Sequence, residues 1–375
     1  MQDYPVQLLQ AMLEHYSPSG SEAEIAHFLR DEMQDKGMNS TLDEAGNVIG
    51  VLGEEGPRIL LCGHMDTVSG HIPIRLDGDL LYGRGAVDAK ASLAAMIVGA
   101  IAAKEKGRAP ARITVAGVVE EETSSKGIRA LIGGKTSYDL AVFGEPSGTS
   151  NVIVGYKGSL KLHLTFRTFG GHSASPWLSE SSFEESYAFW SEFRRQMLNN
   201  NAESKFEAIT GCVTNMVAGG SGNSVPANAI LEIDVRIPPS VHSETLASNV
   251  REFIERYSAG RKDVTVDLRV DDQTEAFLGL TESDALSAFR WAIRKVRGGQ
   301  VALLKKTGTS DINLFAQTQR IPMFAYGPGD SRLDHTQTEH VRISEYLACI
   351  EVYAQAIARL AERAGETRLP PAAAK

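Results

Sequence analysis

The chain has 375 residues, a hydrophobic content of 42% and a formal net charge of −9 at pH 7. This length exceeds what one ordinary hydrophobic core holds, so we expect two domains. The acidic balance argues against nucleic acid as a partner, and no apolar run reaches the roughly 18 residues that predict a membrane span. The three cysteines, Cys62, Cys212 and Cys349, form no Cys-x-x-Cys pair, and the first residues lack the pattern of a signal peptide. A cytoplasmic location is therefore expected.

The first part of the chain alternates between strand and helix patterns. Ser21, followed by Glu24, is typical of a capped helix start, and Gly37 is expected to end this helix. Strands alternating with helices predict a mainly parallel sheet flanked by helices. The further predicted elements are strands near 40–52 and 58–63, a hairpin near 72–82, a helix at 89–106, and strands at 112–119 and 139–144.

The segment 156–271 has a different order, β, α, β, β, α, β, which predicts an inserted α+β domain of ferredoxin-like type. Its expected elements are 159–168, 181–198, 206–218, 229–236, 243–257 and 264–270. After it, a helix at 285–295, a strand near 323–326 and a helix at 344–361 are expected to return to the first sheet. Residues 1–155 and 272–375 are therefore predicted to form one domain.

Five short segments carry metal-binding side chains in a fixed order, 62–66, 88–90, 120–122, 144–146 and 334–336. Several follow apolar runs that read as buried strands, and the carboxyl ends of such strands form the usual site of an open α/β sheet. Zinc binds imidazole nitrogen and carboxylate oxygen, and a catalytic site keeps one position for water. The pattern therefore indicates two adjacent divalent ions and a hydrolase.

Simpler interpretations of these segments stay open at this point. Three successive glutamates, 120–122, are also typical of a solvated charge run, and Asp88 at a helix entrance also fits an N-cap. Cys62 lies in an apolar strand, where a buried thiol is favoured over a metal ligand. Asp66 follows His64 too closely for both to bind metal, so we interpret it as the carboxylate that fixes the tautomer of His64.

Gly83-Arg84-Gly85 before a helix raises the alternative of a phosphate-binding loop and, with it, a nucleotide-dependent amide ligase. Neither a third glycine nor a Lys-Ser/Thr pair follows, which weakens this alternative.

Taken together, the motifs resemble those of the two-zinc amidohydrolases that include acetylornithine deacetylase, succinyl-diaminopimelate desuccinylase, carboxypeptidase G and aminoacylase. The resemblance covers nearly the whole chain in order. Within the family it is strongest to the lysine- and ornithine-releasing hydrolases of the amino-carrier-protein (LysW) pathway, through segments 83–90 and 307–311. The motifs are His64-Met-Asp66, Gly83-Arg84-Gly85 to Lys90, Glu121-Glu122, Gly144-Glu145-Pro146, Gly171-His172-Ser173 and His335-Thr336.

This resemblance implies a zinc-peptidase-like α/β fold whose inserted domain serves as a lid and dimerisation domain. It also implies two metal ions per chain, with zinc favoured and cobalt as the alternative. Asp88 would bridge the two ions. His64 and Glu145 would complete one site, and Glu122 and His335 the other.

Glu121 would be the general base, and His172 of the inserted domain would reach the oxyanion, in many relatives across a dimer interface. Thr123 departs from the family pattern, because relatives often have glycine after the glutamate pair. This departure leaves the local turn open.

The substrate would be held by Arg236, which matches the position that grips an α-carboxylate, with Asn223 beside it. Thr309 and Ser310 lie in the segment that borders the pocket of the leaving group in this family. The neighbouring Lys305 and Lys306 would be contacts for an acidic carrier protein.

The expected function is hydrolysis of an amide bond that releases a free amino acid. The favoured products are lysine or ornithine, released from an amino-carrier protein or from an N-acyl group as in a deacetylase, in lysine or arginine biosynthesis. A homodimer is expected. Two alternatives remain, a dipeptidase or carboxypeptidase of the same family and a non-catalytic binding module on this scaffold.

Overall fold

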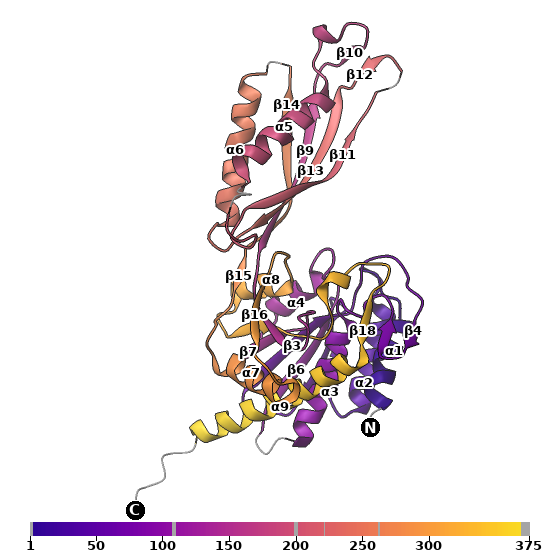
Figure 1. Cartoon of the computed structure of the whole chain (residues 1–375), viewed down its shortest axis with the longest axis vertical. Helices are drawn as coiled ribbons and strands as arrows, with labels where there is room; N and C mark the ends of the chain where they lie inside the picture. Colours follow the sequence, from indigo (N-terminus) through magenta and orange to yellow (C-terminus); the bar gives the residue numbers. More distant parts are fainter. Residues whose placement is uncertain (1–2, 107–109, 199–201, 221, 262, 369–375) are drawn as a thin grey trace, which may run out of the picture. The chain divides into compact units, whose positions relative to one another are not determined.

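The computed structural model describes residues 3–106, 110–198, 202–220, 222–261 and 263–368. The chain divides into two compact units (Figure 1). Unit 1 contains the chain up to Val154, residues Gly279–Leu304 and the chain from Ser310 onward, whereas unit 2 contains Gly155–Leu278 and Lys305–Thr309. That segment 156–271 acts as a lid or dimerisation domain stays a prediction.

The largest sheet has the strand order β1-β2-β6-β3-β7-β17-β8-β15, in which β16 also pairs with β8. All of it belongs to unit 1 except β15 and the last residues of β8 and β16. The central strands β6, β3, β7 and β17 are parallel, whereas β1, β2, β8 and β15 pair antiparallel. The predicted α/β class with a parallel sheet centre is therefore confirmed. The strands are β1 (Asn39–Leu42), β2 (Val48–Leu52), β3 (Arg58–His64), β6 (Arg112–Val118), β7 (Leu140–Phe143), β8 (Asn151–Tyr156), β15 (Phe277–Leu278), β16 (Ala302–Lys306) and β17 (Met323–Ala325).

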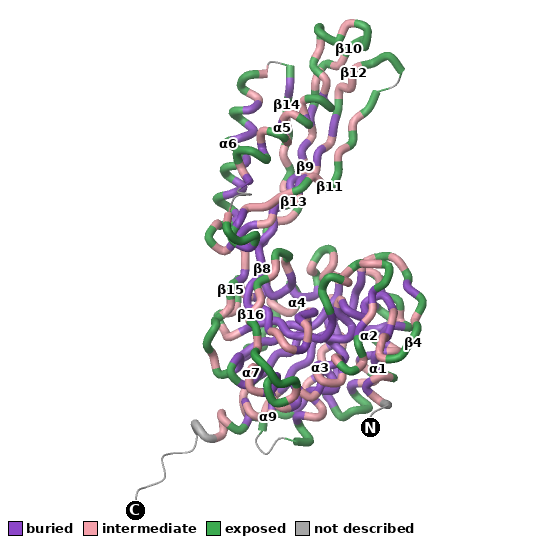
Figure 2. The backbone as a smooth tube through the Cα atoms, viewed as in Figure 1, coloured by how far each residue is buried: buried purple, intermediate pink, exposed green. Residues whose placement is uncertain are grey.

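Helices surround this sheet, and buried positions gather in the interior of unit 1 (Figure 2). Helix α3 is buried on all sides from Lys90 to Ala100, which is typical of a helix in the middle of a core. It packs against α1, α9 and β3. The helices are α1 (Asp3–Glu14), α2 (Ala23–Asp35), α3 (Lys90–Lys106), α4 (Lys126–Gly133), α7 (Asp284–Arg297), α8 (Asp311–Thr318) and α9 (Ile343–Arg368).

A small antiparallel sheet of order β18-β5-β4 completes unit 1. β4 (Arg75–Asp77) and β5 (Leu80–Tyr82) form the predicted hairpin, and β18 (His340–Arg342) pairs with β5. A short 3₁₀ helix, η2 (Ser331–Leu333), precedes β18. This sheet joins two distant parts of the chain that both carry predicted metal ligands.

Unit 2 has an antiparallel sheet of order β11-β13-β9-β14, packed against α5 and α6. Alternate side chains of β13 are buried, as expected for a strand with one covered face. The chain order is the predicted β, α, β, β, α, β. The elements are β9 (Gly158–Arg167), β10 (Gly171–His172), η1 (Pro176–Leu178), α5 (Ser182–Met197), β11 (Thr210–Ala218), β12 (Ser224–Val225), β13 (Asn228–Ile237), α6 (Ser243–Ala259) and β14 (Thr265–Thr274).

The predicted capping of α2 by Ser21 is wrong. Glu22 occupies the N-cap position, and no side-chain hydrogen bond caps the helix. The Glu22 carboxylate instead accepts hydrogen bonds from the main chain of Gly20 at 2.9 Å and of Glu120 at 3.0 Å. The start of α2 is therefore tied to the glutamate triplet, a tertiary contact that the local pattern does not encode. Among the described residues, none of the helices has the length and apolarity needed to cross a membrane.

Candidate metal centre

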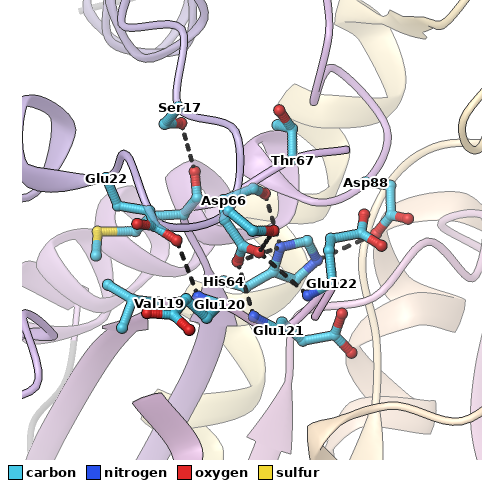
Figure 3. Close-up of polar contacts among 12 residues, drawn as sticks. Ser17, Glu22, His64, Asp66, Thr67, Asp88, Val119, Glu120, Glu121 and Glu122 are labelled. Carbon is cyan, nitrogen blue, oxygen red and sulfur yellow. Dashed lines mark hydrogen bonds and ion pairs between the residues drawn. The ribbon is translucent and has the colours of Figure 1, made fainter. Parts of the chain in front are cut away.

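His64 is the last residue of β3, and its side chain is 2% exposed. Its Nδ1 lies 2.9 Å from the main-chain carbonyl of Asp66 and 3.5 Å from the Asp66 carboxylate. A proton on Nδ1 is shared between these two acceptors, so Nε2 is the nitrogen that would bind a metal after losing its own proton. This Nε2 lies 3.1 Å from Oδ1 of Asp88 (Figure 3).

Asp88 follows the glycine-containing loop before α3 and presents its two oxygens to two different histidines. Oδ1 is 3.1 Å from Nε2 of His64, and Oδ2 is 3.2 Å from Nε2 of His335. Burial raises the pKa of the Asp88 carboxyl, but hydrogen bonds with His335 and His64 outweigh it and hold this pKa well below its usual range. An ionised carboxylate with one oxygen toward each imidazole has the arrangement that a bridging ligand needs.

Asp88, Glu122 and His335 each offer a ligand atom within 4.8 Å of the others. Nε2 of His335 is 2.9 Å from Oε1 of Glu122. Hydrogen bonds with Asp88 and then Glu122 raise the pKa of His335 to about 10. His335 has a φ of 61° and a half-exposed side chain, so the loop that carries it determines where the imidazole lies.

The Asp66 carboxylate is fully buried and holds the main chain of the glutamate triplet. Oδ1 accepts from the N–H of Glu121 at 3.0 Å, and Oδ2 accepts from the N–H of Glu122 at 3.1 Å and from the Ser19 hydroxyl at 2.6 Å. Asp66 therefore fixes the backbone of both glutamates in addition to contacting His64 (Figure 3).

The members of the triplet have different surroundings. The Glu120 side chain turns to the Ser124 hydroxyl and Lys126, away from the histidines. Glu122 faces His335, whereas Glu121 is half-buried, and burial raises the pKa of its carboxyl well above the usual value. A carboxylate with a raised pKa is suited to general base chemistry near neutral pH.

Glu145 follows β7, at the same end of the sheet as His64. Its Oε1 accepts a 2.6 Å hydrogen bond from the hydroxyl of Ser310, the N-cap residue of α8. Within the described ranges, Glu145 does not join a group of three candidate ligands at the 4.8 Å spacing. Cys62 is buried, and burial raises the pKa of its thiol, which disfavours the thiolate that a metal requires.

The predicted substrate residues fall into separate groups. On β13, Arg236 donates to the Thr309 hydroxyl at 3.0 Å and to the Asp234 carboxylate at 2.8 Å, so its guanidinium is held at two points. His172 pairs with Ser224 in the small ladder of β10 and β12, and Asn223, the residue before β12, accepts on its carbonyl from the Ser173 N–H at 2.8 Å, so the structure does not place Asn223 beside Arg236. The structure thus brings Arg236 to Thr309, the segment of His172 to that of Asn223, and Ser310 to Glu145.

The N–H of Ala174 donates to Nδ1 of His172 at 3.0 Å. A ring nitrogen that accepts a hydrogen bond carries no proton, so the proton of His172 lies on Nε2. The side chain is exposed, and Nε2–H is set to act as a donor.

The sequence analysis assigned no role to several charged residues that the structure buries around the centre. Lys90 is fully buried and donates to the carbonyls of Met12 and His15 at the end of α1, and burial lowers its pKa to about 7. Asp311 is 3% exposed, and burial raises its pKa to about 8. The one available signal was position, since Lys90 opens an apolar helix, where a lysine needs hydrogen-bond partners.

Arg84 and Glu339 were also missed. Nη1 of Arg84 lies 2.8 Å from Oε2 of Glu339, and both side chains are almost completely buried. Arg84 belonged to a motif that was noted for its glycines, and Glu339 follows His335 by four residues without a recognised pattern.

Comparison with known proteins shows to which family the chain belongs. Residues 60–359 match the model of peptidase family M20/M25/M40. The LysW-lysine hydrolase of Deinococcus radiodurans is 35% identical over 351 residues, covering 92% of this chain and 93% of the relative. The LysW-lysine/LysW-ornithine hydrolase of Sulfurisphaera tokodaii is 31% identical over 356 residues, with coverage of 94% and 95%.

Solved structures share the fold. A tripeptidase from Staphylococcus aureus superposes with a TM-score of 0.83 at 20% identity, covering 96% of this chain and 99% of that one. A dinuclear metal-binding peptidase of the M20 family from Bacillus subtilis gives a TM-score of 0.71 at 15% identity, with coverage of 96% and 98%. The predicted family resemblance is confirmed, and the chain belongs to peptidase family M20/M25/M40 and is a hydrolase.

Proposed function

We propose that this protein is a metal-dependent hydrolase that cleaves the amide bond linking lysine or ornithine to a LysW-type carrier protein. The single observation that best supports a metal centre is the position of Asp88, whose two oxygens face Nε2 of His64 and Nε2 of His335. The proposed substrate is supported by the relatives described above, which are named LysW-lysine hydrolase and LysW-lysine/LysW-ornithine hydrolase. An N-acyl group in place of the carrier is the nearest alternative, and a role in lysine or arginine biosynthesis in the cytoplasm would follow.

Two imidazoles and several carboxylates form a donor set that suits zinc, with cobalt as the alternative. His64, Asp88 and Glu145 would hold one ion, and Asp88, Glu122 and His335 the other. Bound there, the ions would polarise the scissile carbonyl and activate a water molecule.

The chain's own residues would perform the proton transfers. Glu121 would take the proton of the attacking water and pass it to the leaving amine, a task that its raised pKa supports. Asp66, which accepts from the Glu121 N–H, would keep this carboxylate in place. Nε2–H of His172 would donate to the oxyanion, because its Nδ1 is already an acceptor.

Substrate orientation would come from Arg236, near the carboxyl end of β13, whereas Asn223 would contribute from the segment beside His172. Asp234 and Thr309 hold two nitrogens of the guanidinium, which reduces the entropy lost when it binds a carboxylate. A fixed planar fork is suited to an α-carboxylate. Ser310 would act near the leaving group through its hydrogen bond to Glu145.

A homodimer would use unit 2. Exposed apolar side chains occur close to His172 in the chain, with Phe169 83% exposed, Trp177 78% exposed and Leu178 77% exposed. Large exposed apolar residues mark interaction surfaces. An acidic carrier would be steered by Lys306, since Lys305 already faces Glu207 at 3.6 Å.

The proposed substrate is tested by comparing amino acid release from a carrier conjugate, N-acetylated lysine and ornithine, and dipeptides. We expect the highest kcat/KM for lysine or ornithine joined to the carrier. Faster cleavage of dipeptides would favour the peptidase alternative. A protein that binds two ions but cleaves none of these compounds would favour the binding module.

The proposed bridging role makes a prediction for metal content. His335→Ala is expected to lose mainly one of two ions, because His335 would serve one site, whereas Asp88→Ala is expected to lose both. Metal analysis after dialysis in a metal buffer measures this, with His27→Ala as a control because His27 is exposed on α2. Removal by a chelator should abolish hydrolysis reversibly, and full activity without bound metal would disprove the mechanism.

A further inference from the structure

The buried ion pair between Arg84 and Glu339 connects two parts of the proposed metal centre. Oε2 of Glu339 lies 2.8 Å from Nη1 of Arg84, and the side chains are 1% and 3% exposed. Oε1 of the same carboxylate accepts from the N–H of Val87 at 2.9 Å and of Asp88 at 3.2 Å. Nε of Arg84 donates to the carbonyl of Gly70 at 2.9 Å. Both charged groups therefore have several hydrogen-bond partners.

The desolvation of such a pair is costly, so a buried ion pair is weak evidence for a contribution to stability. What a fully satisfied buried network does supply is one fixed arrangement of the segments that it joins. Here one oxygen of Glu339 fixes the backbone of Asp88, and the other binds the arginine that precedes Asp88 by four residues. The network thus defines where the Asp88 backbone lies.

Glu339 also belongs to the segment of His335, four residues upstream. It immediately precedes β18, which pairs with β5 through His340–Tyr82 and Val341–Leu81, and its carbonyl accepts from the N–H of Gly83 at 3.3 Å. The hydrogen bonds of the Glu339 side chain with the Val87 and Asp88 N–H groups continue the connection between these two segments as far as Asp88. Two ligand segments far apart in the sequence are thereby held in register, and Nε2 of His335 lies 3.2 Å from Oδ2 of Asp88.

The two histidines do not depend on this connection equally. His64 is 2% exposed at the end of a central strand, and its Nδ1 is held by Asp66. His335 is 51% exposed on a loop, so neighbouring side chains confine it less. The position of His335 relative to Asp88 depends mainly on how its loop is anchored, and Glu339 is the buried anchor that follows it.

We infer that the Arg84–Glu339 ion pair is a positioning device for the half of the metal centre formed by Asp88, Glu122 and His335. The inference rests on the proposed metal-dependent function. Neither residue of the pair would touch the metal or the substrate. Their effect would be transmitted through the Asp88 backbone and the His335 loop.

The test is a titration of the chelator-treated full-length protein with Zn²⁺ or Co²⁺, followed by calorimetry and by the Co²⁺ absorption spectrum. In Glu339→Gln the amide nitrogen cannot replace the oxygen that faces Arg84, because two donors would meet. We expect the affinity for one of two ions to fall about 10–100-fold, the usual effect of losing a residue that supports a metal ligand, while the affinity for the other changes little.

Three further variants test whether the loss of metal affinity is specific to the Arg84–Glu339 pair. Arg342→Ala is the matched control, since Arg342 lies on β18, is exposed and faces Asp79; it should bind metal like the wild type. Arg84→Lys keeps the charge but loses the donor to Gly70, and it should show the same selective loss even if Glu339→Gln does not fold. In a His335→Ala background, Glu339→Gln should add little further loss, because both changes act on the same half.

The thermal unfolding temperature of the metal-free variants records any purely structural effect. Lower stability with both metal affinities unchanged in the variants, or an equal loss at both sites, would overturn the positioning role alone. A wild-type protein that binds no divalent ion would instead overturn the proposed function on which the inference rests.

Discussion

Replacing Glu121 with Gln is expected to lower kcat by about two to four orders of magnitude, the range for losing a positioned proton shuttle. The amide occupies nearly the same space, and the main-chain N–H can still donate to Asp66. The side-chain amide, however, cannot accept the proton of the attacking water. Metal content should stay at the wild-type level, because Asp88, Glu122 and His335 remain in place. Kinetics and metal analysis of the same preparation measure both quantities.

Glu120→Gln is the matched control for this prediction. Glu120 is the preceding member of the triplet, and its carboxylate contacts Ser124 and Lys126. Its replacement should leave kcat close to that of the wild type. If Glu120→Gln lost activity and Glu121→Gln did not, the general base would have been assigned to the wrong glutamate.

Elements with strong local signals could be predicted from the sequence. The buried runs of β3, β6 and β7 and the apolar helix α3 lie close to their expected positions, because their residues exclude other arrangements. Helices α1, α4 and α8 were not predicted. α4 and α8 are eight residues long, so their formation depends on packing more than on their own sequence.

In the candidate site, too, features with a local sequence pattern could be predicted, and features that depend on distant contacts could not. The order of His, Asp and Glu at strand ends indicated a metal centre, because parallel strands bring their carboxyl ends to one edge. The second function of Asp66, as the acceptor for two main-chain N–H groups, requires a contact between segments 55 residues apart. Glu339 contacts the Val87 N–H across 252 residues, and no local pattern carries information about such a pair.

Replacing His172 with Ala is expected to lower kcat by about 10²–10³-fold, the usual cost of removing one donor to an oxyanion. The N–H of Ala174 fixes Nδ1 of His172 as an acceptor, so the imidazole is prepared to donate from Nε2 before substrate binds. Metal content should not change, because His172 belongs to unit 2 and every proposed ligand belongs to unit 1. His163→Ala is a suitable control, since His163 is also in unit 2 and faces Glu232 at 3.3 Å.

Mixing the two inactive variants tests which chain of a dimer supplies His172. If it acts across the interface, a hybrid of His172→Ala and Glu121→Gln contains one site in which both groups are intact, and part of the activity should return after subunit exchange. Exchange itself is followed with differently tagged chains. High activity in His172→Ala alone would disprove a role at the oxyanion. Proven exchange without recovered activity would show that His172 and Glu121 must come from the same chain, and the catalytic role of His172 would stand.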